Sequence, residues 1–281
     1  MKNLHKLYYK DYYKDVKFAL KKGEVTSSGS VADMIVEAKS LSEQFKFKES
    51  DFFKELDFLE INDLYSPKDS QFRKRELEVL YPGLVTGVGI KHEAKVTGEF
   101  KLGMHFDYTT GLPIIYGSSV KGVLRSYFKD KYKGNADVDA LIADIFEGGS
   151  YADRNTPLEK RKSKPVYDRD VFFDAIVSPN EAGKILESDA LAPHGGDKHD
   201  NPFADPVPIP FLKIAPGVKL RFRFKLVPTY DATGEIVMPV DDKLGLFTDI
   251  LTTFGIGAKT NVGYGQMEEV EDKSLIKTMT L

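Results

Sequence analysis

The segment 255–265 holds four glycines and Lys259, a combination that lets backbone N–H groups approach a phosphate chain and supplies a counter-charge. Its spacing differs from that of a P-loop, because no glycine directly precedes the lysine. It also differs from the dinucleotide fingerprint, because the third glycine is missing. A helix C-cap followed by a tight turn accounts for the glycines equally well. Both interpretations stay open at this point.

A second candidate anion site begins with Gly-Ser-Ser just before an apolar stripe of helical spacing. Ser118 or Ser119 is expected to be the N-cap, because serine hydroxyls accept hydrogen bonds from the first free amides of a helix. The N-terminus of a helix attracts anions. Lys121, Arg125 and Lys129, spaced by four, would extend the positive charge along one side. The alternative is a capped helix with a solvated basic face.

Basic side chains also line one face of the clearest predicted strand, residues 219–227. Apolar residues alternate there with Arg221, Arg223 and Lys225, so the two sets point to opposite faces. A basic strand face of this kind binds a polyanion, contacts a neighbouring protein or simply faces solvent on an antiparallel sheet.

A group of acidic residues and histidines between residues 189 and 205 suggests a metal site. It contains Asp189, His194, Asp197, His199, Asp200 and Asp205. The spacing matches no established ligand motif and the chain has no cysteine, so we expect no metal. The sequence has no G-x-S-x-G nucleophile motif, and His92, beside Glu93, is only a weak candidate for a general base.

The periodicity of apolar residues predicts the elements that position these segments. Residues 1–78 read as helical, and residues 178–210 as irregular. From residue 84 the expected order is strands at 84–90 and 96–106, helices at 118–129 and 135–146, strands at 171–177 and 219–227, a helix at 244–254 and a strand at 262–270. This order fits the βαββαβ plan of an α+β, ferredoxin-like (RRM-like) domain with insertions. We therefore predict an N-terminal helical extension at residues 1–78 and one elaborated domain at residues 79–281.

The charges are nearly balanced over 281 residues, with 40 basic and 43 acidic side chains, but they are segregated along the chain. Residues 117–134 and 213–225 carry local charges of +4 and +5, whereas residues 228–250 carry −4. A near-neutral total therefore does not exclude a polyanionic partner. The sequence shows no cysteine, no apolar run long enough for a membrane span and no secretory pattern, which predicts a cytoplasmic protein.

Two of these segments resemble the RAMP superfamily of CRISPR-associated proteins. Residues 114–125 read Ile-Ile-Tyr-Gly-Ser-Ser-Val-Lys-Gly-Val-Leu-Arg, similar to the superfamily signature P-x-I-P-G-S-S-x-K-G-x-L-R. Tyr116 stands where the signature has a proline. The loop 255–265 resembles the glycine-rich loop that closes the same domain. The resemblance covers residues 80–270 and implies a ferredoxin-like RAMP domain.

Three further segments, 172–175, 189–194 and 206–212, are similar to the sixth-subunit family of the Cmr (type III-B) effector complexes. In that family aromatic residues follow the position of His194, where this chain has two glycines. This difference leaves no special role assigned to His194.

The resemblance implies a non-catalytic subunit that binds CRISPR RNA and caps the 3′-end side of the backbone filament. It also implies other RAMP backbone subunits as partners, indirect contact with target RNA, and no cofactor. The cutting residue of such backbones is an aspartate of the repeated subunit, and residues 89–96, the corresponding stretch, contain none. The expected RNA-binding residues are Ser118, Ser119, Lys121, Arg125, Arg221, Arg223, Gly257, Lys259, Asn261 and Tyr264.

Two other functions are compatible with the sequence. One is a RAMP endoribonuclease that processes CRISPR RNA or cleaves target RNA, with His92, Asp174 and His194 as its candidate residues. The other is a scaffold that contacts only protein. Tyr264 and Tyr127 are candidates for stacking on a base, although core packing is the expected role of Tyr127.

Overall fold

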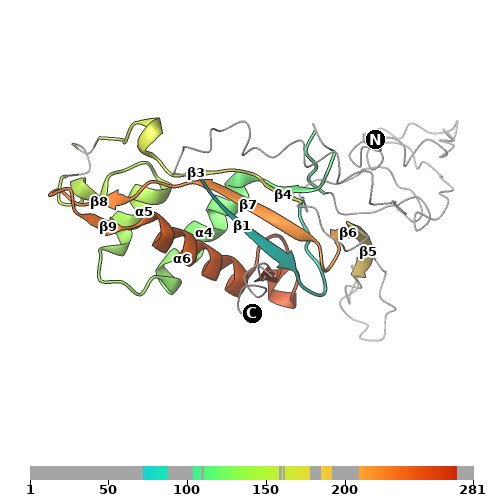
Figure 1. Ribbon diagram of the computed structural model, residues 1–281. Helices are drawn as coiled ribbons and strands as arrows, with labels where there is room; N and C mark the ends of the chain where they lie inside the picture. Colours follow the sequence, from blue (N-terminus) through green and yellow to red (C-terminus); the bar gives the residue numbers. More distant parts are fainter. Residues whose placement is uncertain are drawn as a thin grey trace, which may run out of the picture.

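The computed structural model describes residues 72–87, 104–108, 111–157, 160, 162–177, 185–191 and 209–270, which form a mixed α/β structure (Figure 1). The helices are α4 (Gly117–Lys131), α5 (Val138–Phe146) and α6 (Val240–Phe254). The strands are β1 (Phe72–Val79), β2 (Ile114–Ile115), β3 (Val171–Phe172), β4 (Ala175–Val177), β5 (Leu186–Leu191), β6 (Ile209–Ile214), β7 (Lys219–Lys225), β8 (Thr229–Tyr230), β9 (Ile236–Met238) and β10 (Met267–Glu269). No helix in this part of the chain is long and apolar enough to cross a membrane.

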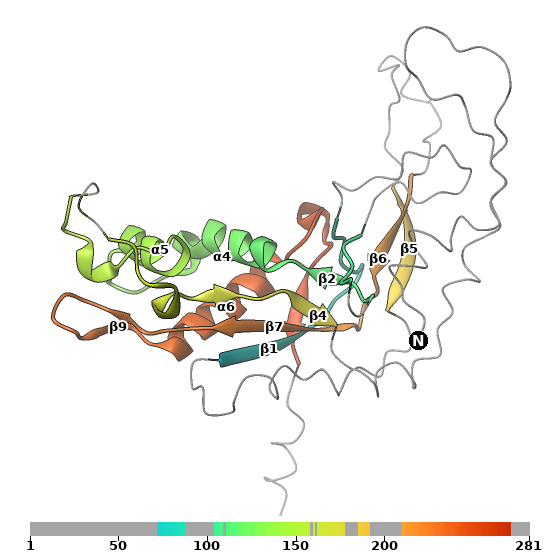
Figure 2. The ribbon, with the colours of Figure 1, turned by 90° about the horizontal axis from the view of Figure 1, so that it is seen from above.

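The main sheet runs in the order β10-β1-β7-β4-β2, with β3 also paired to β7, and all its strand pairs are antiparallel. Figure 2 shows α4 and α5 on one side of β7 and β4. The hairpin of β5 and β6 and the hairpin of β8 and β9 project from opposite ends of the molecule. The sheet therefore has one face under helices and one face that no described helix covers (Figure 1).

The alternating sequence of β7 determines the two faces of the sheet. Leu220, Phe222 and Phe224 are at most 1% exposed and pack beneath α4 and α6. The ring of Phe247 in α6 lies 5.6 Å from that of Phe224, measured between centroids. Burial of each such side chain contributes about 1.5–3 kcal/mol, so the register that turns them toward the helices is strongly favoured. The predicted strand and its two faces are confirmed.

The first strand of the sheet corrects the predicted N-terminal boundary. Residues 72–78 were expected in a helical extension, but they form most of β1. Leu77 and Val79 alternate with charged residues and are buried against the core. β1 lies between β7 and β10, so both of its edges are paired. Residues 1–71, the rest of the predicted extension, lie outside the described part of the chain.

Several other predicted boundaries also change. Of the expected strand at 84–90, Leu84 and Val85 form only isolated bridges, and residues 88–103 lie outside the described part. The strand at 171–177 is broken into β3 and β4. The segment expected to be irregular contributes β5 and the start of β6, and the final strand is limited to β10. The predicted helices 118–129, 135–146 and 244–254 are confirmed as α4, α5 and α6.

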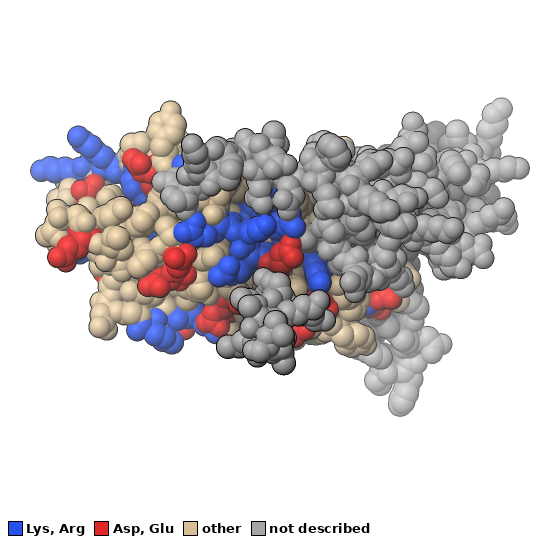
Figure 3. Space-filling view, viewed as in Figure 1, with Lys and Arg blue, Asp and Glu red and all other residues tan. Residues whose placement is uncertain are grey.

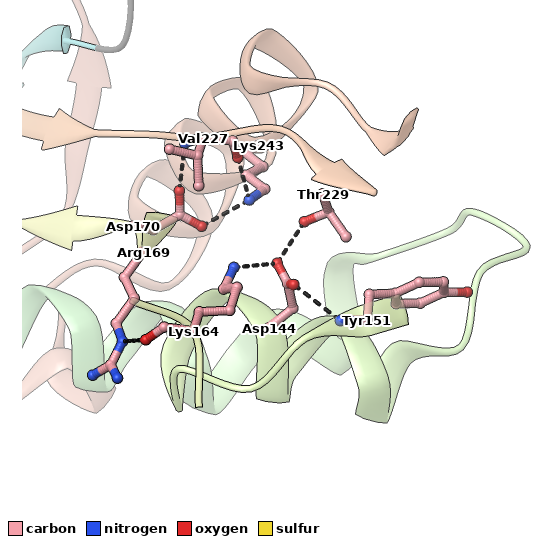
Figure 4. A network of polar contacts seen from close by, with 8 residues as sticks. All are labelled: Asp144, Tyr151, Lys164, Arg169, Asp170, Val227, Thr229 and Lys243. Carbon is pink, nitrogen blue, oxygen red and sulfur yellow. Dashed lines mark hydrogen bonds and ion pairs between the residues drawn. The ribbon is translucent and has the colours of Figure 1, made fainter. Parts of the chain in front are cut away.

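A buried ion pair joins α6 to the segment that leads into β3 (Figure 4). The Lys243 Nζ lies 2.7 Å from Oδ2 of Asp170, and both side chains are fully buried. Lys243 also donates to the carbonyl of Val227, and the Val227 N–H donates to the other oxygen of Asp170. Both charged groups thus have hydrogen-bond partners in addition to each other, which a buried pair requires.

A second buried carboxylate, that of Asp144 in α5, completes this network (Figure 4). It accepts hydrogen bonds from the hydroxyl of Thr229 at 2.8 Å and from the N–H of Tyr151 at 3.0 Å. The Lys164 ammonium lies 3.1 Å from it. The network therefore fixes the long loop between α5 and β3 to both α5 and the end of β7.

The charged forms of Lys243 and Asp170 depend on each other in the buried site. Burial raises the pKa of Asp170 and lowers that of Lys243, because both charged forms lose solvation. Their mutual attraction opposes both shifts. Removal of one partner would leave the other charge buried and uncompensated.

Lys243→Met should lower the free energy of unfolding by about 3–5 kcal/mol, because it leaves the Asp170 carboxylate buried without its cation. Urea denaturation followed by circular dichroism measures the change. The double variant Asp170→Asn/Lys243→Met removes the remaining charge and should recover most of the loss. A double variant as unstable as Lys243→Met would show that the buried charge is not the cause.

Candidate nucleic-acid interface

The start of α4 is capped differently from the sequence prediction. The N-cap is Tyr116, which makes no side-chain capping bond, and both Ser118 and Ser119 lie inside the helix with exposed side chains. Oδ1 of Asp174 accepts the N–H of Gly117 at 2.7 Å. The prediction of a serine N-cap was therefore wrong. The first amide of the helix is therefore bound by a carboxylate of the chain itself, and the side chains of Ser118 and Ser119 are exposed beside it.

The basic stripe of α4 is partly neutralised. Arg125 forms an ion pair with Glu147, and Lys129 with Asp139. Lys121, half-buried near the start of the helix, has no carboxylate partner among the described residues. Of these three basic residues of α4, Lys121 is therefore the one that forms no ion pair with a described residue.

A histidine flanks the start of α4. The ring of His105 lies 4.3 Å from that of Tyr116, between centroids, and its Nδ1 is 3.2 Å from the hydroxyl of Thr86. Burial lowers the pKa of His105, so its ring is neutral at pH 7. Burial also raises the pKa of Tyr116, with contributions from Tyr108 and Asp174. This side of the site is therefore polar without carrying positive charge.

The glycine-rich loop is shaped by close backbone contacts. At Gly257 the φ angle is +101°, and a Cβ there would lie 2.4 Å from the carbonyl oxygen of Val85. The N–H of the next residue, Ala258, donates to that same oxygen at 2.8 Å. The tight-turn interpretation of the glycines is thus supported at this position, because a side chain would push the loop away from residue 85.

Lys259 has a φ of +62°, the one positive value at a non-glycine residue in the described part of the chain. This left-handed conformation is uncommon for a residue other than glycine, and such positions occur preferentially at functional sites. Lys259 is half-buried, and the neighbouring Asn261 is exposed. The loop therefore presents one lysine and one amide at the surface.

Tyr264 is a core residue. Its side chain is 8% exposed, its ring packs edge-on against Phe211, and its hydroxyl donates to Asp189 at 2.8 Å. Lys213 also donates to this carboxylate, at 2.7 Å. Burial and the bond to Asp189 raise the pKa of Tyr264 to about 12. The expected role of Tyr264 in base stacking was wrong, because its ring joins the loop to the β5–β6 hairpin.

Two exposed apolar side chains near the loop were not singled out from the sequence. Tyr81 is 85% exposed and Val262 is 61% exposed. Pro82, next to Tyr81, lies 3.6 Å from the position of a Cβ at Gly263, so both segments belong to one surface. The Tyr-Pro-Gly sequence at 81–83 is typical of a turn and could have indicated an exposed ring.

The two arginines predicted on β7 differ in their contacts. Arg221 forms an ion pair with Glu76 across the β1–β7 register, with its Nη2 2.8 Å from Oε1. Arg223 donates to the carbonyl oxygen of Asp174 at 3.0 Å, and its guanidinium lies over the ring of Phe173 at 6.0 Å. Arg223 thus lies beside an aromatic ring, whereas Arg221 shares its charge with a carboxylate.

The candidate residues form separate surfaces. The start of α4 packs on residues 172–174, where a Cβ at Gly117 would lie 2.2 Å from a backbone oxygen. The glycine-rich loop packs on residues 83–85. No group of three potential metal ligands occurs in the described residues. His92, His194 and the other members of the predicted acidic cluster beyond Asp189 lie outside them.

The fold and these surfaces define a RAMP domain. The family model of the RAMP superfamily matches residues 76–268, and the chain belongs to this superfamily. Among curated proteins, it is 30% identical over 169 residues to the CRISPR system Cmr subunit Cmr6 of Saccharolobus solfataricus, covering 60% of this chain and 49% of that protein. It is 35% identical over 111 residues to Cmr6 of Pyrococcus furiosus, covering 35% and 30%. The matched region therefore spans less than half the length of these curated relatives.

A solved structure has a similar fold. A chain of the type III-B Cmr-beta complex bound to cognate target RNA, determined by cryo-EM, superposes with a TM-score of 0.52 at 23% identity. The match covers 81% of this chain and 67% of the other. At this identity the likeness concerns the fold alone.

Tyr264→Phe should lower the free energy of unfolding by about 1–3 kcal/mol, because it removes a hydrogen bond to the charged Asp189 carboxylate, which keeps only its bonds from Lys213 and from the Ala190 N–H. The matched control is Tyr81→Phe, which removes a hydroxyl from an exposed side chain and should change stability by less than about 0.5 kcal/mol. Urea denaturation measures both. Equal effects of the two substitutions would contradict a structural role for the Tyr264 hydroxyl.

Stability should fall as the pH drops below 6.5, the ordinary pKa of histidine. The unfolded chain then binds a proton at His105 that the folded chain, with its lowered pKa, binds less well. His105→Gln should make the stability less dependent on pH in this window, with both proteins compared by denaturation at about pH 8 and about pH 5.5, on either side of that pKa. Parallel pH profiles would show that His105 does not contribute.

Proposed function

We propose that this chain is a non-catalytic RNA-binding and assembly subunit of a type III-B CRISPR effector complex in antiviral defence. It would hold CRISPR RNA in the cytoplasm at the 3′-end side of the backbone filament. Other RAMP subunits would be its neighbours, and target RNA would be contacted only indirectly. The observation that carries the proposal is the 30% identity over 169 residues to a Cmr6 subunit.

The strand order supports a ferredoxin-like, RRM-like domain as the core of this subunit. Four strands, β1, β4, β7 and β10, follow one another along the chain with a helix after the first and after the third. In the sheet they stand in the order fourth, first, third, second. This order supports the βαββαβ plan, with β2, β3, β5, β6, β8 and β9 as additional strands.

The available cations suit a guide whose sequence varies. Lys121 and Lys259 have no carboxylate partner among the described residues, and both lie beside backbone turns with exposed polar groups. Contacts of this type reach phosphate and sugar and carry no sequence information. A guide RNA must be held whatever its bases are, so backbone contacts are the expected mode.

Charge reversal at both lysines, Lys121→Glu/Lys259→Glu, should weaken binding to guide RNA of any sequence. The slope of log affinity against log salt concentration should fall by about 1 for each phosphate that the protein no longer neutralises. Fluorescence anisotropy with labelled RNAs of two unrelated sequences, at several salt concentrations, measures both effects.

Each single variant is compared with Lys133→Glu, which changes the net charge equally beyond the far end of α4, where Lys133 is exposed. Lys133→Glu should leave affinity and salt slope nearly unchanged. An unaltered salt slope in the double variant would refute the assignment of the two phosphate contacts.

The geometry of Asp174 supports a binding role over hydrolysis. Its carboxylate accepts the Gly117 N–H, and its carbonyl accepts from Arg223, so both groups serve to position the chain. The purified protein should leave labelled repeat RNA and target RNA intact, with or without Mg²⁺. Discrete cleavage abolished by Asp174→Asn, His92→Ala or His194→Ala would instead establish an endoribonuclease.

A further inference from the structure

The helix-free face of the sheet carries its own pattern of side chains. The β1–β7 register places Phe72 beside Lys225, Lys74 beside Arg223 and Glu76 beside Arg221 on this face. Residues that face each other across an antiparallel pair point to the same side of the sheet. Figure 3 shows lysine and arginine side chains gathered over the region where Figure 1 places β1 and β7.

The charge on this face is uneven along the strands. Glu76 pairs with Arg221 in the middle. Glu78 lies opposite Glu268 of β10 on one side and Lys219 of β7 on the other, so two carboxylates and one lysine lie toward the end of β1. At the other end the cations Lys74, Arg223 and Lys225 are gathered. Positive charge is therefore concentrated over the start of β1 and the end of β7.

Backbone carbonyl groups orient two of these cations. The Lys225 ammonium donates to the carbonyl oxygen of Tyr167 at 2.9 Å. Arg223 donates to the carbonyl oxygen of Asp174 at 3.0 Å. Lys74 is exposed beside them. The two bonds therefore hold both cations over this end of the sheet, next to an exposed lysine.

Aromatic rings alternate with these cations. Phe72 and Phe173 stack with their centroids 5.8 Å apart and their planes at 23°. The guanidinium of Arg223 lies over Phe173. Tyr167, whose carbonyl is held by Lys225, has a side chain that is 80% exposed. An exposed ring costs free energy in water and is suited to stacking on an unpaired base.

We propose that the residues Phe72, Lys74, Tyr167, Phe173, Arg223 and Lys225, here called the basic–aromatic end of the sheet, bind a single-stranded segment of RNA. Lys74, Arg223 and Lys225 contact phosphates, and Tyr167 stacks on a base. Paired bases in a duplex do not expose their faces, so the rings favour single-stranded RNA. This proposal rests on the proposed function, which supplies RNA as the ligand. The site itself is separate from Lys121 and Lys259.

The backbone places this surface close to the start of α4. The segment 172–174 separates the two: Asp174 binds Gly117 through its carboxylate and Arg223 through its carbonyl. Asp174 therefore lies between the start of α4 and Arg223 on the helix-free face.

Anisotropy with labelled single-stranded oligoadenylate and the full chain tests the proposal. Tyr167→Ala should weaken binding by about tenfold, the effect typical of one lost base stack, whereas Tyr167→Phe should bind like the wild type. Lys74→Glu should reduce the salt slope by about 1. The matched controls are Tyr230→Ala, at an exposed tyrosine of the β8–β9 hairpin, and Lys133→Glu, and both should bind normally.

The outcomes separate the two proposals. If Lys121→Glu/Lys259→Glu weakens binding while Tyr167→Ala and Lys74→Glu bind normally, the proposed function stands and the basic–aromatic end is not an RNA site. Such a result would indicate a protein neighbour on this face. If the wild-type chain does not bind single-stranded RNA, both proposals are refuted. Loss of affinity in Tyr167→Ala, with equal loss on duplex RNA, would also refute the stacking.

Discussion

The ion pair between Lys243 and Asp170 determines where the chain returns to the sheet after its long loop between α5 and β3. Both charges are fully buried, so neither can be solvated if the other moves away. Because Asp170 immediately precedes β3, the pair fixes α6, the end of β7 and the entry into β3 relative to one another. Tyr167 and Phe173 lie within three residues of Asp170 along the chain, so the position of the basic–aromatic end depends on this pair.

The two ends of the RAMP domain are stabilised in different ways. Around residues 144–170 the chain is held by ion pairs between buried charged side chains. Around residues 255–265 it is held by backbone contacts too close for any Cβ, since a Cβ at Gly265 would lie 1.9 Å from the carbonyl oxygen of Ile256. The first kind of contact is sensitive to charge, and the second to the size of a side chain.

The sequence predicted the elements whose own residues show a regular apolar pattern. It missed an element in which charged residues interrupt that pattern. The stripes of α4 and α6 and the alternation of β7 are visible in the residues themselves, and all three were found. β1 was missed because four charged residues at 73–76 obscure the alternation of Leu77 and Val79. Glu76 of β1 pairs with Arg221 of β7, which lies 145 residues further along the chain, and no local pattern can indicate such a pairing.

The candidate site shows the same division. Lys121 and Lys259 could be selected by type and spacing. The role of Tyr264 could not be, because its partner Asp189 is 75 residues distant and belongs to a hairpin that read as irregular. The ion pairs that neutralise Arg125 and Arg221 are likewise tertiary contacts. The rings of Tyr81 and Phe173 gain significance only once the fold shows where they lie.

Asp174 illustrates how one exposed residue can serve two surfaces. Its side chain belongs to the start of α4 and its main chain to the helix-free face of the sheet. Exposed positions usually tolerate many amino acids over evolutionary time. At position 174 a replacement must keep both a short acceptor side chain and the local backbone path. Related chains that diverge freely elsewhere on this surface should therefore vary little at this position, and where they do vary, compensating changes should occur at both surfaces together.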